Sequence, residues 1–219
     1  MIDALRRGLA ERADPAKAPG MQAYMKSAMP FCGVQKPARV ALAREVFPAH
    51  PLESFEAWRD TVLALWRDAA YREERYLAIA LVEDKRYGAF RTLDALPLYE
   101  ELIVGGAWWD YVDAVAAGPL GSLLPEVAPA LRAWAIDANM WKRRSAIIAQ
   151  LRRKRETDFV LLTDCIEPNR GDREFFIRKA IGWALRSYAW VEPDAVIAYC
   201  DTHALSPLSR REALKNVGS

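Results

Sequence analysis

The sequence predicts an all-α protein, built as an α-α superhelix, or solenoid, of stacked helical pairs. Apolar residues recur with the 3.6-residue period of helices along nearly all of the chain, and no segment has the alternation typical of a half-buried strand. Prolines divide the chain into about a dozen short helices, which favours a solenoid over a four-helix bundle. No exact sequence repeat is visible, so this prediction depends on the number and length of the helices. The curved surface of such a solenoid is its natural binding face.

The expected helices begin and end at recognisable signals. Prolines are tolerated at helix starts, where the missing amide hydrogen would have no partner. Ser54 or Glu53 precedes one helix, Asp172 precedes another, and Ser206 with Pro207 opens the last. The predicted helices cover residues 2–12, 20–28, 37–46, 52–69, 72–84, 95–104, 108–117, 127–137, 140–154, 158–166, 173–190, 193–203 and 207–217.

Length and composition indicate one cooperative domain over residues 1–219, with 52% hydrophobic and 27% charged residues. A chain of this size buries about 70% of its extended-chain surface when it folds. The longest apolar run, Tyr76 to Val82, is far short of the roughly 20 residues that cross a bilayer. The N-terminus also lacks the apolar stretch of a secretory signal. We therefore expect a cytoplasmic protein and no membrane partner.

Several catalytic chemistries are disfavoured by the residues present. The three cysteines have no CxxC spacing, and the two histidines, His50 and His203, lie in no zinc-binding pattern. Glycine patterns that cradle phosphates are missing, since Gly105 and Gly106 stand alone. We therefore expect neither a metal nor a cofactor.

The positive charge of the chain is concentrated in one segment. Residues 142–186 contain 12 basic and 6 acidic residues, whereas residues 1–141 contain 16 and 19. A basic segment in an otherwise acidic chain is typical of a polyanion-binding site, and the alternative is a solvated helical face.

The predicted helix 173–190 has two different faces. A core stripe includes Ile177, Ile181 and Leu185. The roughly opposite side alternates aromatic and basic residues, in a row formed by Phe176, Lys179, Trp183, Arg186 and Trp190. Stacking surfaces beside phosphate-neutralising charges are typical of nucleic-acid grooves. The alternative is that a neighbouring helix covers this row.

Arg144 lies inside the apolar stripe of the predicted helix 140–154, between Trp141 and Ile148. An arginine on a core-facing row needs a partner. It could form a buried ion pair, or it could line a cleft and present its planar fork to a phosphate. The basic neighbours of Arg144, including Arg143, favour the phosphate.

Trp109 and Asp113 are four residues apart and therefore share one helical face. A carboxylate beside an indole attracts a cationic group through its charge and a cation–π contact. The alternatives are core packing for the tryptophans and a structural ion pair for Asp113. Hydrolysis of a bond to a cationic leaving group needs no general acid, so one carboxylate that stabilises an oxocarbenium-like centre and positions water could suffice.

Several long motifs are distributed over essentially the whole chain. The motifs are Ala23-Tyr24-Met25-Lys26, Pro30-Phe31-Cys32-Gly33-Val34, Trp108-Trp109-Asp110-Tyr111-Val112-Asp113, Trp141-Lys142-Arg143-Arg144-Ser145-Ala146-Ile147, Phe175-Phe176-Ile177-Arg178-Lys179-Ala180-Ile181-Gly182-Trp183-Ala184-Leu185-Arg186 and Leu205-Ser206-Pro207-Leu208-Ser209-Arg210-Arg211-Glu212-Ala213-Leu214. With these motifs the chain resembles the AlkD-type DNA alkylation repair glycosylases, which implies a monomer that is associated with the nucleoid if bacterial. The resemblance implies HEAT-like helical repeats with a concave DNA-binding face. It also implies excision of N3- and N7-alkylated purines, such as 3-methyladenine and 7-methylguanine, from double-stranded DNA without flipping the base into a pocket.

The resemblance further implies roles for individual residues. Asp113 is the catalytic carboxylate beside the deoxyribose, Trp109 and Trp183 pack on the lesioned nucleotide's backbone, and Arg144 holds a flanking phosphate. The residues expected to contact DNA elsewhere are Tyr24, Lys26, Arg143, Lys179 and Arg186.

The chain departs from the pattern of the family at Met29 and Val40, where an aromatic and a basic residue are expected. Duplex contacts near the N-terminus are therefore expected to be weaker. No lysine is placed as a Schiff-base nucleophile, so the predicted enzyme is a monofunctional glycosylase without lyase activity. Two other functions remain open: a noncatalytic helical-repeat protein that binds DNA structure or a protein partner, and a protein scaffold with tryptophans as interface anchors.

Overall fold

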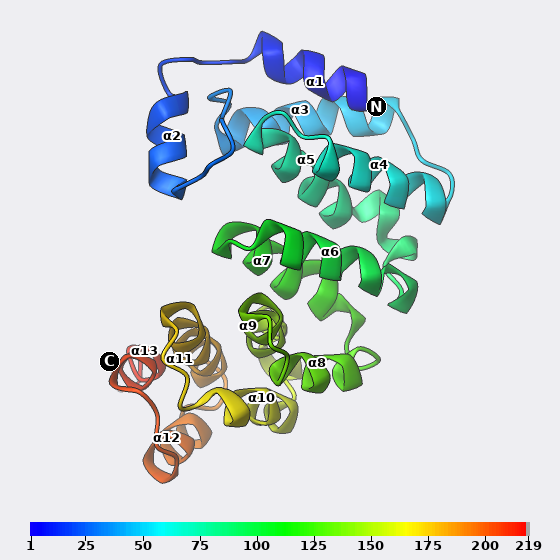
Figure 1. Ribbon diagram of the computed structural model, residues 1–219. Coiled ribbons are helices and arrows are strands. Elements are labelled where there is room, and N and C mark those ends of the chain that lie inside the picture. Colours follow the sequence, from blue (N-terminus) through cyan, green and yellow to red (C-terminus); the bar gives the residue numbers. More distant parts are fainter. Residues whose placement is uncertain (218–219) are drawn as a thin grey trace. The chain divides into compact units, whose positions relative to one another are not determined.

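A computed structural model describes residues 1–217, which contain helices and no strand, and this confirms the all-α prediction (Figure 1). The chain divides into two compact units, residues 1–91 (unit 1) and 92–219 (unit 2). One cooperative domain over residues 1–219 stays a prediction.

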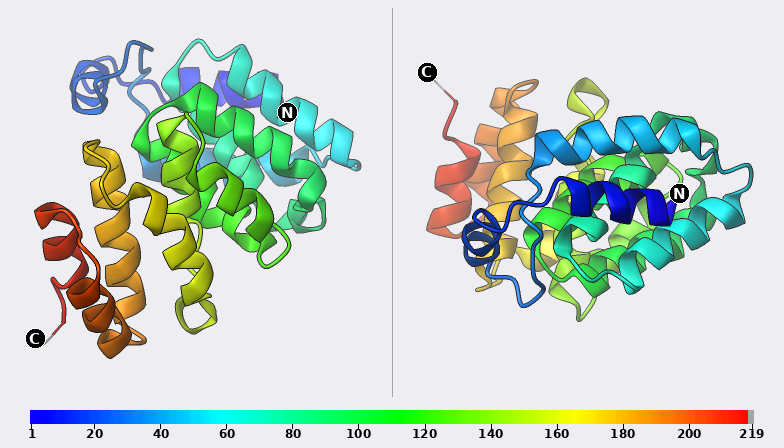
Figure 2. Two further views of the ribbon diagram at one scale, coloured as in Figure 1. Left: turned by 60° about the horizontal axis from the view of Figure 1, so that its bottom comes forward. Right: turned by 90° about the horizontal axis from the view of Figure 1, so that it is seen from above.

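Unit 1 consists of five α-helices and a closing 3-10 turn. These are α1 (Ile2–Glu11), α2 (Ala18–Met25), α3 (Lys36–Ala49), α4 (Phe55–Arg67), α5 (Arg72–Glu83) and η1 (Lys85–Phe90). Helix α4 packs on α5, and α3 contacts both α1 and α5. The fully buried Trp58 of α4 donates from its indole nitrogen to the carbonyl oxygen of Leu81 on α5, at 3.3 Å. Helix α2 lies at the edge of the unit, joined to α1 and α3 by loops (Figure 2).

The described part of unit 2, residues 92–217, contains the remaining eight α-helices. These are α6 (Leu96–Gly106), α7 (Trp109–Val115), α8 (Ala128–Ala135), α9 (Met140–Ile148), α10 (Phe159–Ile166), α11 (Phe175–Ala189), α12 (Pro193–Thr202) and α13 (Pro207–Ala213). Short turns join them: η2 (Leu93–Ala95), η3 (Ala116–Leu120), η4 (Gly121–Leu123), η5 (Lys154–Glu156) and η6 (Glu167–Asn169). Successive helices pair, α6 with α7 and α8 with α9, as the stacking prediction requires.

Helix α11 is the centre of the C-terminal part of unit 2. It packs on α9, α12 and α13, and its stripe of Ile177, Ile181 and Leu185 is fully buried. The predicted core face of this helix is therefore confirmed.

The predicted capping residues account for several helix starts. Ser54 and Ser206 accept hydrogen bonds from the amides of Ala57 and Ser209, at 3.1 Å each. Proline occupies the first turn of α2, α3, α6, α8, α12 and α13. Proline and cap signals are local, so they are readable before the tertiary structure is known.

Two predicted helices are too long. The helix expected over residues 140–154 ends at Ile148, because the Gln150 side chain instead pairs with the backbone N–H and C=O of Asp158, at 2.8 and 2.9 Å. Lys154 then takes a left-handed conformation, with φ of 53°. The last helix ends at Ala213 and not at residue 217.

Candidate functional site

Helix α7 carries the two predicted residues of the candidate site on one face. Ala107, in a left-handed conformation with φ of 42°, ends α6, and Trp108 follows as the extended residue before α7. Trp109 and Asp113 then lie one turn apart in the helix, and both are half-buried.

Arg144 of α9 donates hydrogen bonds from two nitrogens to the Asp113 carboxylate. Its Nε lies 2.7 Å from Oδ1 and its Nη2 lies 2.8 Å from Oδ2. Its Nη1 donates to the backbone oxygen of Phe176 on α11. Arg144 is only 5% exposed, so of the two alternatives for this arginine the structure contains the buried ion pair.

Burial raises the pKa of the Asp113 carboxyl, whereas the hydrogen bonds and charge of Arg144 act to lower it. The neighbouring Asp110 carboxylate adds to the rise. The Asp113 side chain keeps 15% of its surface exposed, so a molecule in solution can reach it. A desolvated carboxylate with a specific charge partner is typical of functional sites, although structural ion pairs share this feature.

An aromatic cluster formed by Trp108, Trp141 and Phe176 packs beside Arg144. The ring centroids lie 5.5 Å apart for Trp108 and Phe176, and 5.1 Å apart for Trp141 and Phe176. The guanidinium carbon of Arg144 lies 5.8 Å from the Phe176 centroid. The tandem tryptophans therefore have different surroundings: Trp108 packs within this cluster, whereas Trp109 shares the face of Asp113.

The sequence model of the DNA alkylation repair enzyme family matches residues 5–217. The chain belongs to this family. The chain is also similar to a solved structure described as a predicted DNA alkylation repair enzyme from Enterococcus faecalis. That protein is 32% identical to this chain in sequence, and the two structures superpose with a TM-score of 0.86. That match covers 95% of this chain and 98% of the other. No curated protein matches the sequence. The predicted family resemblance is confirmed, and the family membership supports a role in DNA alkylation repair.

In this family member, the row predicted along α11 is not one open face. Lys179 and Arg186 both form ion pairs with one oxygen of Glu212 on α13, at 3.1 and 2.9 Å. Phe176 packs in the aromatic cluster, whereas Trp190 is 74% exposed. A neighbouring helix therefore covers part of the row, as in the alternative weighed from the sequence. Trp183, between the two cations, is half-buried.

Gly182 explains how α13 reaches these cations. A Cβ atom at this position would lie 2.8 Å from the backbone oxygen of Ser209 and 2.5 Å from the Cβ of Glu212. The missing side chain lets α13 approach α11 closely, and Ser209 donates from its hydroxyl to the carbonyl oxygen of Arg178. Sequence analysis missed Glu212, although the motif containing it and the one containing Gly182 were both noted.

Arg143 is also engaged within the protein. Its Nη2 lies 3.0 Å from the Asp172 carboxylate, and its Nη1 donates to the backbone oxygens of Asp137 and Ala138. Lys142 pairs with Glu100 and Asp137. Much of the positive charge around α9 is thus balanced by acidic residues outside the helix.

Tyr24 and Lys26 belong to unit 1 and lie at the end of α2. Tyr24 is 78% exposed, and Lys26 is an exposed left-handed C-cap with φ of 49°. Both side chains are open to solvent. Contact of Tyr24 or Lys26 with DNA stays a prediction.

A buried carboxylate shapes the loop that follows α2. Glu73 of α5 is fully buried and accepts hydrogen bonds from the amides of Cys32, Gly33 and Val34, at 3.1, 2.9 and 3.0 Å. Gly33 has φ of 89°, a conformation that favours glycine. Burial and the nearby Glu73 raise the pKa of the Cys32 thiol to about 11, so this cysteine is not activated as a nucleophile.

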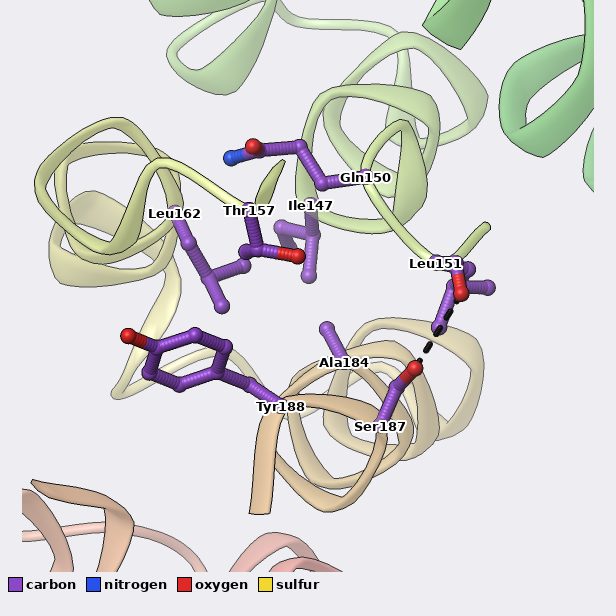
Figure 3. Close-up of a pocket in the computed structure, with 8 residues that line it drawn as sticks. All are labelled: Ile147, Gln150, Leu151, Thr157, Leu162, Ala184, Ser187 and Tyr188. Carbon is purple, nitrogen blue, oxygen red and sulfur yellow. Dashed lines mark hydrogen bonds between the residues drawn. The ribbon is translucent and has the colours of Figure 1, made fainter. Parts of the chain in front are cut away.

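A small cavity lies between α9, α10 and α11, and Figure 3 shows the side chains around it. Leu162, Ala184 and Tyr188 are among the residues that line it, and Ser187 donates to the backbone oxygen of Leu151 at 3.1 Å. Its volume of about 10 Å³ has room for one water molecule at most, and none for a purine base.

Two further properties concern only the described residues. Among residues 1–217, no cluster of three His, Cys, Asp or Glu side chains is placed to hold a metal ion. None of the helices in that range has the length and hydropathy of a membrane span.

Proposed function

We propose that this member of the family is a monofunctional DNA glycosylase, which hydrolyses the N-glycosidic bond of cationic N3- and N7-alkylated purines in duplex DNA. The observation that carries the proposal is the largely buried Asp113 carboxylate, which accepts hydrogen bonds from Arg144 at 2.7 and 2.8 Å and lies on the same helical face as Trp109. The proposal includes a monomeric, cytoplasmic protein that needs no metal or cofactor.

The proposed reaction uses the charge of the damaged base. When the bond from C1′ to the base nitrogen breaks, its electron pair neutralises the positive base, so no general acid is required. The sugar develops positive charge, which the Asp113 carboxylate stabilises. Water then bonds to C1′, and its proton passes to Asp113 and on to solvent. The Arg144 fork keeps the carboxylate oriented, and its charge favours the ionised form.

Arg144 retains capacity for the predicted phosphate contact. A guanidinium has five N–H donors, and three serve Asp113 and Phe176. In this proposal the remaining donors bind a flanking phosphate. Trp109 and Trp183 supply apolar surface for the lesioned nucleotide's backbone in this proposal.

The proposed enzyme acts without flipping the base into a pocket. Selectivity then comes mainly from the weak glycosidic bond of a cationic base.

A noncatalytic DNA-binding protein is the second candidate. It is favoured by the buried ion pair itself, because both Asp113 oxygens already accept hydrogen bonds from Arg144. A carboxylate with a purely structural role would have the same partner.

Release of free bases from methylated duplex DNA distinguishes the two candidates, with products identified by mass. Asp113→Asn should abolish release of 7-methylguanine and 3-methyladenine while DNA affinity stays within about twofold, because the amide keeps the shape and loses the charge. Asp110→Asn, on the same helix, is the matched control and should retain activity.

Each other outcome has a definite meaning. Unchanged release by Asp113→Asn removes this carboxylate from the mechanism. If the wild-type protein releases no base but binds duplex DNA tightly and with strong salt dependence, the noncatalytic function is correct.

A further inference from the structure

An open depression lined by arginines lies in unit 2, between the loop before α11 and the loop that joins α12 to α13. Its volume is about 580 Å³, and it opens broadly to solvent. Its walls include Arg170, Arg173 and Arg178, with Asp172 and the 204–206 segment. We call this cavity the arginine pocket.

The arginine pocket carries an excess of positive charge. The Asp172 carboxylate is occupied, since Arg143 binds one oxygen at 3.0 Å and the amide of Glu174 binds the other at 2.8 Å. Arg170 pairs with Glu167 at 2.8 Å. Arg173 and Arg178 have no acidic partner within residues 1–217, which leaves two positive charges in one cavity.

Arg178 lies on α11 and has one buried nitrogen. Its Nε is buried without a hydrogen-bond acceptor in the described part of the chain, while the residue still lines the cavity. A buried polar atom without a partner calls for an explanation, and one explanation is an acceptor group that binds there. Guanidinium groups match the planar and tetrahedral oxyanions of carboxylates and phosphates with paired donors.

We propose that the arginine pocket binds a phosphate group through Arg173 and Arg178. The phosphate comes either from the DNA backbone or from a free phosphate ion or nucleotide. Its binding chemistry is separate from bond cleavage at Asp113, so the proposal does not depend on glycosylase activity.

The test uses inorganic phosphate as the probe, titrated calorimetrically into the full chain at constant ionic strength. Arg173→Gln/Arg178→Gln should weaken phosphate binding at least tenfold, because each lost charged hydrogen bond costs about one order of magnitude. Arg7→Gln/Arg44→Gln removes two exposed arginines of unit 1 and should leave phosphate binding unchanged. Arg173→Gln alone, at an exposed position, should give an intermediate loss even if the double variant is poorly folded.

Duplex DNA binding then identifies the source of the phosphate. If the pocket holds the DNA backbone, the double variant lowers DNA affinity and reduces the slope against salt by about two, whereas unchanged DNA binding identifies free phosphate. Equal phosphate binding by the wild-type protein and Arg173→Gln, or no phosphate binding by the wild-type protein, would overturn the proposal.

Discussion

The Asp113–Arg144 pair leads to a quantitative prediction about stability. Arg144→Met should destabilise the fold by about 3 kcal/mol near neutral pH, because it leaves a largely buried carboxylate without its charge partner. Asp113→Asn should cost only about 1 kcal/mol, since the amide oxygen still accepts one hydrogen bond from Arg144. Burial already raises the pKa of Asp113 despite Arg144, so a neutral side chain is well tolerated there.

The assay is urea unfolding of the wild-type protein, both single variants and the double variant. The double variant should lose about 2 kcal/mol less than the two single variants together, because removing the charge of Asp113 relieves the defect left by Arg144→Met. A coupling below about 0.5 kcal/mol would refute the reasoning.

The penalty of Arg144→Met should also depend on pH. In this variant the folded-state pKa of Asp113 stays above the unfolded value, so the folded protein holds the proton more tightly. Stability relative to wild type should therefore rise as pH falls from the folded-state pKa toward the ordinary value of 3.8. Equal penalties at about pH 7.5 and about pH 4.5 would contradict this.

Two further perturbations test the contacts around the site. Glu212→Gln should raise the affinity for duplex DNA several-fold and steepen its salt dependence, because Lys179 and Arg186 lose their shared counter-charge. Asp194→Asn is the charge-matched control. Equal effects of the two variants on DNA affinity would show that the ion pairs do not restrain DNA binding. Glu73→Gln should lower the free energy of unfolding by about 2 kcal/mol, because one amide oxygen replaces a carboxylate that accepts hydrogen bonds from three N–H groups. Urea unfolding measures this change. The control Glu56→Gln, at an exposed position, should lower the free energy of unfolding much less.

Helix positions were readable from the sequence because their signals are local. Each of the thirteen predicted helices has a counterpart among the described residues, with proline or a capping side chain at many starts. The helix ends were less readable. Gln150 ends α9 early, because its side chain forms hydrogen bonds with the backbone of Asp158, eight residues away. No local sequence pattern predicts that contact.

The candidate site was readable only in part. The spacing of Trp109 and Asp113 places them on one face of any helix, and an arginine in an apolar stripe demands a partner. Which partner Arg144 takes depends on how α7, α9 and α11 pack. The paired hydrogen bonds from Arg144 to Asp113 and the hydrogen bond to the backbone of Phe176 could therefore be identified only from the tertiary structure.

Periodicity, prolines and caps in the sequence decided that the chain is helical and where most helices begin, because these features act within one or two turns. The tertiary structure decided which charges are free. Glu212 neutralises Lys179 and Arg186 from 26 or more residues away, and Gly182 permits that approach. Charge pairing depends on distance in space, which separation along the chain does not reveal.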